Sequence, residues 1–142
     1  MFDLTGKTAL ITGSGQGVGA GIARALAEQG ASIVINDYFP DRAEAMVVEL
    51  QNNGGKAVAC PFDVTDIDAV KAGVEKAEAE LAPIDILINN AGVLRDKSFS
   101  KMTLDDFKLV IDVHLMGSVN CTKAVWEIMK QQNTEISDHP LS

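Results

Sequence analysis

Five glycines occur within the nine residues from Gly13 to Gly21, in the stretch TGSGQGVGAG. Glycine tolerates positive φ and has no Cβ, so a ligand can approach the backbone of such a turn closely. A helix that begins in the turn adds unpaired N–H groups and the positive end of its dipole. These residue types therefore predict an anion site whose natural guest is a phosphate or pyrophosphate.

The register of the glycines departs from the common dinucleotide fingerprint G-x-G-x-x-G. Depending on the first glycine chosen, Val18 or Ala20 stands at the third glycine position. The pattern T-G-x-x-x-G-x-G does fit, and it begins at Thr12. Because an ordinary strand-to-helix turn can also be rich in glycine, the context of the turn must decide its role.

An acidic residue, Asp37, stands 18 positions after Gly19 at the end of the next apolar run. In a dinucleotide fold, an acidic side chain there accepts hydrogen bonds from the adenosine ribose and repels a 2′-phosphate, which favours NAD over NADP. Gln16 points the same way, because it offers no cation to such a phosphate. A surface turn aspartate before Pro40 is the alternative interpretation.

Apolar, β-branched runs alternate with helical patterns along the chain. We expect strands at residues 7–12, 31–36, 56–60 and 84–89, and helices at 17–29, 40–53, 65–81 and 103–131. This alternation implies parallel βαβ units with right-handed crossovers, and near-continuous apolar strands imply a sheet covered on both faces. The predicted fold is α/β: a Rossmann-like doubly wound parallel sheet of about four strands, in the order 3-2-1-4, followed by a long helix.

Polar and small residues follow the third and fourth predicted strands. Asp63 and Val64 follow one, and the sequence NNAG at 89–92 follows the other. Ligands of open parallel sheets bind outside the carboxyl ends of the strands. We therefore expect these residues to share one site with the glycine turn and Asp37.

The composition is that of an ordinary globular chain, with 142 residues of which 46% are hydrophobic and 23% charged. The formal net charge of -8 repels phosphate backbones, which argues against a nucleic-acid partner. Cys60 and Cys121 form no C-x-x-C or metal-ligand pattern, so we expect two free, buried thiols and no metal. With no signal-peptide or membrane-span pattern, we expect a soluble, cytoplasmic protein without a membrane partner.

The motifs TGSGQGVG at 12–19, Asp37, Asp63-Val64 and NNAG at 89–92 together resemble the short-chain dehydrogenase/reductase family. The resemblance covers about residues 1–132. The stretch NNAGVLRDKSF at 89–99, with VHLMGS at 113–118, most resembles the hydroxyacyl-CoA dehydrogenase domain of peroxisomal multifunctional enzymes and their bacterial relatives. That resemblance adds the peroxisome as a second compartment to consider.

The resemblance implies roles for the residues of the predicted site. The turn would hold the pyrophosphate of NAD, Asp37 the adenosine ribose, and Asp63 and Val64 the adenine. The turn comprises Gly13, Ser14, Gly15, Gln16, Gly17, Val18 and Gly19, and Asn90, Ala91 and Gly92 would line the nicotinamide side. His114 stands where most of the family has a proton-relay asparagine, although the hydroxyacyl-CoA branch resembles this chain in having histidine. A structural, half-buried histidine is the alternative.

The family's general acid/base pair has no counterpart in this sequence. A phenol of pKa ~10 needs a nearby cation to trade a proton near neutrality, and the family supplies a lysine four residues after its tyrosine. Here the only tyrosine is Tyr38, and residue 42 is Arg42. Residues 133–142 are polar where a fifth strand is expected. We therefore expect residues 1–132 to be the cofactor-binding portion of such an enzyme and 133–142 an atypical tail.

Three functional interpretations remain. The first is an NAD-preferring oxidoreductase of secondary alcohols and ketones, a 3-hydroxyacyl-CoA among them, whose cofactor-binding part has little activity alone. The second is a non-catalytic nucleotide-binding or oligomer-interaction module that pairs through the helix at 103–131. The third is an unstable by-product, because the fourth strand leaves an apolar edge.

Overall fold

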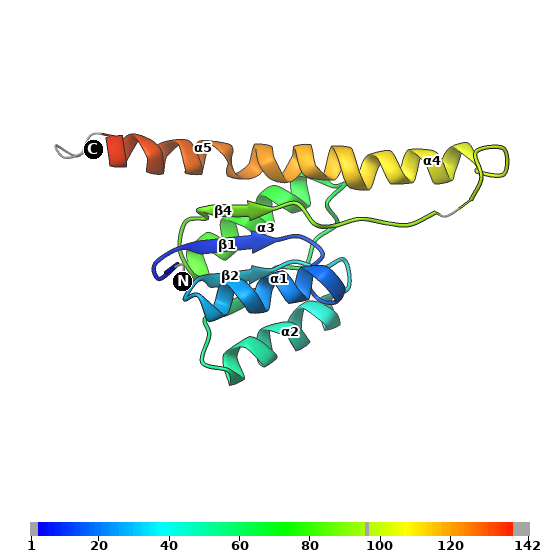
Figure 1. Ribbon diagram of the computed structural model, residues 1–142. Helices are drawn as coiled ribbons and strands as arrows, with labels where there is room; N and C mark the ends of the chain where they lie inside the picture. Colours follow the sequence, from blue (N-terminus) through cyan, green and yellow to red (C-terminus); the bar gives the residue numbers. More distant parts are fainter. Residues whose placement is uncertain (1–2, 96, 138–142) are drawn as a thin grey trace.

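The computed structural model describes residues 3–95 and 97–137. Four parallel strands form one sheet in the order β3-β2-β1-β4: β1 (Thr8–Ile11), β2 (Ser32–Ile35), β3 (Ala57–Ala59) and β4 (Ile86–Ile88). Three helices connect them: α1 (Gly17–Glu28), α2 (Pro40–Asn52) and α3 (Ile67–Glu80). The predicted doubly wound sheet and its strand order are confirmed (Figure 1).

Alternate residues of the strands supply two separate cores, one on each face of the sheet. Ile11 and Ile33 belong to the core beneath α1 and α2, while Leu10 and Val34 belong to the core beneath α3 and the last helix. Both faces of the central strands are therefore buried, which explains why their sequence is apolar without alternation.

Local sequence sets the ends of the helices. Asp66 caps α3, its Oδ1 accepting the N–H of Ala69 at 3.1 Å. Pro40 begins α2, where its missing N–H costs nothing. Gly30 follows α1 with φ +99°, a conformation that favours glycine, and a Cβ there would lie 2.7 Å from Oγ1 of Thr5.

The stretch predicted as one helix at 103–131 differs from that prediction. It consists of α4 (Leu104–Ile111), a π-helical turn (Asp112–Met116) and α5 (Gly117–Ser137), so helix continues past the expected boundary at 132, and residues 138–142 lie outside the described part. One extra residue in a turn rotates the following face by about 100°. α5 buries Cys121 and Val125 against the sheet, whereas α4, which extends past the carboxyl ends of the strands, buries no side chain (Figure 1).

The two cysteines, Cys60 and Cys121, are unpaired and buried in the same core, as predicted. Burial raises the pKa of the Cys60 thiol to about 11 and that of Cys121 to about 12. Because the thiolate is the reactive form, we expect neither to react with Ellman's reagent at about pH 8 until the protein unfolds in guanidinium. Rapid labelling of the native protein would contradict this arrangement.

Candidate functional site

A cavity of about 620 Å³ lies at the carboxyl ends of the four strands. Its walls come from the turn after β1, from the segments that follow β2, β3 and β4, and from the helical stretch at α4. Nine of the residues predicted from the sequence line it: Gly13, Gln16, Gly17, Asp37, Asp63, Val64, Asn90, Ala91 and Gly92. The structure thus brings the four predicted strand ends together at one hollow.

The remaining turn residues shape the turn rather than line the cavity. Ser14 is fully buried, and its Oγ donates to the carbonyl of Ile11 at 2.7 Å. Gly15 lies against Asp37, and Gly19 lies against the carbonyl of Gly13. Val18, in contrast, is largely exposed to solvent.

The turn is joined to the segment after β4 through Thr12. Its buried Oγ1 accepts the N–H groups of Asn90 at 3.0 Å and Ala91 at 2.9 Å. The Asn90 side chain completes the junction by donating to the carbonyl of Gly13 at 3.2 Å. A Cβ at Gly19 would clash with that carbonyl and lie 2.5 Å from Nδ2 of Asn90, so the approach requires glycine there.

A second polar junction, at Asn36, was not predicted from the sequence. The Oδ1 atom of this buried side chain accepts the N–H of Gly13 at 3.2 Å, and its Nδ2 donates to the carbonyls of Cys60 and Phe62 at 3.1 and 3.2 Å. It therefore fixes the turn to the segment after β3. A polar residue at the end of an otherwise apolar run is the signal that could have identified it.

The N-terminus of α1 faces the cavity without a capping side chain. Its N-cap residue, Gln16, has extended backbone and makes no side-chain cap hydrogen bond, and Gln16 and Gly17 both line the cavity. The first N–H groups of an α-helix have no intrahelical acceptor. Together with the helix dipole, these donors suit a phosphate group.

The Asp37 side chain lies in the cavity wall with only 5% of its surface exposed. Its Oδ2 accepts the N–H of Gly15 at 3.1 Å, and its Oδ1 accepts the N–H of Phe39 at 3.0 Å. Because each carboxylate oxygen has a second lone pair, both can still accept a hydroxyl from a ligand. Asp63 is oriented in a similar way, its Oδ1 accepting from the N–H and Oγ1 of Thr65.

His114 lies in the π-helical turn, behind the segment that follows β4. A Cβ at Gly92 would lie 2.6 Å from Cε1 of His114, so the imidazole packs directly on the backbone of that glycine. Nε2 lies 3.0 Å from the N–H nitrogen and 2.9 Å from the carbonyl oxygen of Val93. A single nitrogen either accepts or donates, so the tautomer decides which of the two bonds forms.

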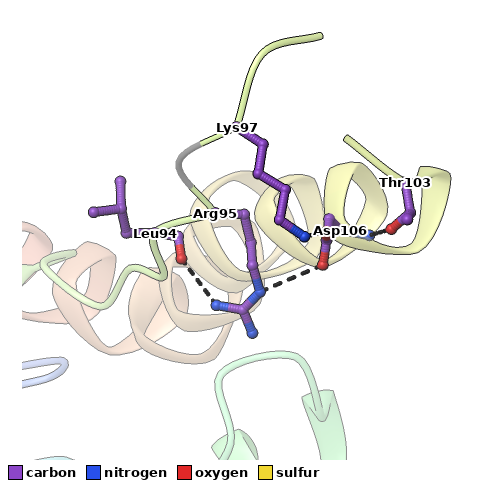
Figure 2. Close-up of polar contacts among 5 residues, drawn as sticks. All are labelled: Leu94, Arg95, Lys97, Thr103 and Asp106. Carbon is purple, nitrogen blue, oxygen red and sulfur yellow. Dashed lines mark hydrogen bonds and ion pairs between the residues drawn. The ribbon is translucent and has the colours of Figure 1, made fainter. Parts of the chain in front are cut away.

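The loop before α4 is held to that helix by Asp106 (Figure 2). Nζ of Lys97 lies 3.2 Å and Nε of Arg95 3.5 Å from its carboxylate, while the N–H of Asp106 donates to Oγ1 of Thr103. The Lys97 hydrogen bond above all lowers the pKa of Asp106. These contacts are therefore complete above the ordinary aspartate range near pH 4 and weaken only as the pH falls through the lowered pKa. Arg95, held in this way, lines the cavity.

Three residues after β2 also line the cavity: Tyr38, Phe39 and Arg42. Tyr38 lies next to Asp37 in this wall. The sequence did not identify Arg42 as a residue of this cavity. Its place in the first turn of the helix after Asp37 is the signal that could have found it.

Comparison with known proteins agrees with this geometry. A family model described as short chain dehydrogenase matches residues 7–136. The chain belongs to the short-chain dehydrogenase family. It is 40% identical over 140 residues to the peroxisomal multifunctional enzyme type 2 of Mus musculus, covering 90% of this chain and 18% of that relative.

Solved structures of the family superpose closely on this chain. A gluconate 5-dehydrogenase from Burkholderia cenocepacia in complex with NADP and tartrate has a TM-score of 0.87 and 40% identity, covering 92% of this chain and 51% of that one. A 3-oxoacyl-[acyl-carrier protein] reductase from Brucella melitensis with bound NAD has a TM-score of 0.83 and 31% identity, covering 89% and 50%. This short-chain dehydrogenase thus spans about half the length of the solved chains it matches.

Two classes of feature are absent from residues 3–95 and 97–137 of this short-chain dehydrogenase. No three histidine, cysteine or acidic side chains there come together as metal ligands. Nor does any helix of that part have the length and apolar character needed to cross a membrane.

The Thr12 junction is testable with an isosteric substitution. In Thr12→Val the N–H of Ala91 loses its acceptor, while that of Asn90 keeps only the Ile88 carbonyl at 3.1 Å. An unsatisfied buried donor costs about 1–3 kcal/mol. We expect the free energy of unfolding, measured by urea denaturation, to fall by about that amount. Thr12→Ser keeps the hydroxyl and is the matched control, so an equal loss in both variants would contradict this role.

Proposed function

We propose that the cavity binds a nicotinamide dinucleotide, with NAD preferred to NADP, as the cofactor-binding part of an oxidoreductase of secondary alcohols and ketones. The observation that supports this most directly is the buried carboxylate of Asp37. Two backbone N–H groups orient it, and it faces the same cavity as the uncapped N-terminus of α1. An acceptor for ribose hydroxyls beside a donor site for a pyrophosphate suits a dinucleotide.

Each part of the dinucleotide has a matching wall in the cavity. The first turn of α1 would bind the pyrophosphate, and Asp63 and Val64 would flank the adenine. Asn90, Ala91 and Gly92 would line the nicotinamide, a segment that Thr12 holds against the glycine turn. When bound, the cofactor gives or accepts the hydride, while the protein binds and orients it.

We propose that His114 orders the nicotinamide side of the site. Its ring packs on Gly92, and its Nε2 forms a hydrogen bond with the backbone of Val93, so it fixes the segment that follows β4. His114 stands at the position where most of the family has asparagine. We also propose that Nε2 relays a proton, because this atom donates in one tautomer and accepts in the other. Because the sequence lacks the family's Tyr and Lys pair, we expect these 142 residues alone to turn over little substrate.

The substrate belongs to the proposal only as a class. The family suggests a secondary alcohol or ketone as the reacting group of the substrate. The names of the relatives suggest that this group belongs to a sugar acid or an acyl thioester. Two free, buried thiols support a reducing compartment such as the cytoplasm.

The ribose assignment is tested by Asp37→Ala. Loss of charge-assisted hydrogen bonds to two hydroxyls should weaken NAD binding about tenfold or more, measured by isothermal titration calorimetry, and narrow the gap between NAD and NADP. Asp41→Ala, in the first turn of α2 but outside the cavity wall, is the matched control. An unchanged preference in Asp37→Ala would overturn the assignment, and no binding of either dinucleotide by the native chain would overturn the proposed function.

A second proposal concerns the assembly of this chain. Apolar side chains of α4, the π-helical turn and α5 are exposed, among them Leu104 at 74% and Leu115 at 57%. They recur along one helical stretch with Phe107, Ile111, Val119 and Trp126. We propose that this exposed apolar face packs against its counterpart in a second copy of the chain, because exposed apolar surface of this kind marks an interface and two-fold pairing is self-complementary.

Charge placed on this face should separate the copies. We expect Leu115→Arg to convert an oligomer into a monomer, measured by size-exclusion chromatography with light scattering, because pairing would bury two unpaired charges. Val48→Arg introduces the same charge at an exposed apolar position of α2 and should leave the oligomer intact. A native chain that is monomeric at high concentration would contradict the proposed pairing.

A further inference from the structure

The buried side chain of Asn36 belongs to the cavity wall, yet its polar atoms are directed at the protein. It lines the cavity and is only 1% exposed. Its Oδ1 accepts the N–H of Gly13, and its Nδ2 donates to the carbonyls of Cys60 and Phe62. Because an amide nitrogen carries two hydrogens, these carbonyls use both of them. Asn36 therefore has no donor left for a ligand, and it acts on binding through the segments that it holds.

These backbone partners determine the orientation of the Asn36 amide. A reversed amide would place Nδ2 against the N–H of Gly13 and Oδ1 against two carbonyl oxygens, so every contact would become repulsive. The partners belong to two segments that are far apart in the sequence. If either segment moved away, a buried polar group would lose its partner, which is unfavourable.

On one side, the Asn36 amide continues the connection between β2 and β3 beyond the end of the sheet. The N–H of Cys60, just after β3, donates to the carbonyl of Ile35 at 2.7 Å. Pro61 follows, and a proline has no N–H with which to extend such a ladder. The carbonyls on either side of this proline are the ones that bond Asn36. A side chain thus attaches the segment after β3 where the backbone ladder stops.

On its other side, Asn36 holds the glycine turn. Its backbone carbonyl accepts the N–H of Ser14 at 2.7 Å, in addition to the side-chain bond to Gly13. Gly13 has φ +64°, and a Cβ there would lie 3.0 Å from Cα of Ala91, so the segment after β4 also confines the turn. Asn36 therefore holds the turn at one position relative to the segment after β3.

These two segments are the walls to which the proposed function assigns the pyrophosphate and the adenine. A ligand that joins the two groups benefits from both walls only when the walls stand at the spacing that its own covalent bonds impose. Walls that can shift must be ordered at the moment of binding, which lowers the affinity. A fixed junction between the walls removes that loss without touching the ligand.

We propose that Asn36 is a positioning residue that sets the spacing between the pyrophosphate wall and the adenine wall, and so raises the affinity for the two groups joined in one molecule. This inference rests on the proposed function. It gives a buried amide without a donor for the ligand a share in the affinity for the whole cofactor. Because Thr12 and Asn90 hold the segment after β4, we expect the effect of Asn36 on the adenosine half.

The test compares ADP with its separate parts, adenosine and inorganic pyrophosphate, each titrated into the full chain and followed by NMR chemical shifts. The product of the dissociation constants of the parts, divided by that of ADP, is the effective concentration of one part beside the other. Asn36→Leu keeps the branched shape and removes the hydrogen bonds. It should lower the effective concentration about tenfold, while the affinity for each part alone stays within about twofold. Asn36→Ala should lower it about threefold, because a water can replace the amide among the polar groups.

Two control variants separate a loss of positioning from a loss of stability. Leu50→Ala opens a cavity in the core at the end of α2, so it should lower the free energy of unfolding and leave the effective concentration unchanged. Gln51→Met removes a side-chain amide that donates to the carbonyl of Ala57, the first residue of β3, and should also leave it unchanged. Neither residue lines the cavity. The thermal midpoint of each variant shows whether it is folded.

The possible outcomes distinguish this inference from the proposed function. An unchanged effective concentration in the Asn36 variants would overturn the inference alone, and so would an equal fall in Leu50→Ala. A parallel loss of affinity for ADP and for both parts would also overturn it, because each wall would then need the amide by itself. If Asn36→Leu does not fold, Asn36→Ala decides. A native chain that binds neither ADP nor its parts would overturn both the inference and the proposed function.

Discussion

The site depends on a close backbone approach between the turn after β1 and the segment after β4. Gly13 and Gly19 lack the side chains that would separate the two segments, and Asn90 fills the space with an amide that bonds the Gly13 carbonyl. Thr12 secures the contact by accepting two N–H groups from the far segment. If these segments moved apart, the walls proposed to bind the pyrophosphate and the nicotinamide would no longer belong to one cavity.

An acidic protein with the proposed pyrophosphate site must attract that doubly charged group locally. The net charge of -8 repels anions at long range, so the donors that matter are the free N–H groups at the start of α1 and the cations at the cavity wall. Asp37 adds a negative charge at the adenosine end, and the backbone bonds that orient it also moderate it. Arg42, which follows β2, and Arg95, which follows β4, both line the cavity and add positive charge to its wall.

The sequence predicted the fold because its strands are apolar on both faces and because glycine, proline and aspartate stand at the ends of its helices. Gly30, Pro40 and Asp66 set helix ends that were readable from residue type alone. The sequence did not predict the π-helical turn at Asp112–Met116. One extra residue in a turn leaves the local apolar pattern unchanged, although it rotates the helix that follows. Asn36 and Arg42 were missed for a different reason: their partners, Gly13 and the cavity, are distant in sequence and meet them only in the folded chain.

The proposed cofactor site and the family's proton-transfer pair involve different parts of the fold. The walls of the cavity come from residues at the carboxyl ends of β1 to β4 or from the helical stretch after them. The only phenol, Tyr38, follows β2, while Gly92 follows β4. Since β1 lies between these strands, the two positions are separated by two strand spacings, about 10 Å. In the proposed binding mode, a phenol at that distance would lie on the adenosine side of the cavity, too far from the nicotinamide side to exchange a proton there.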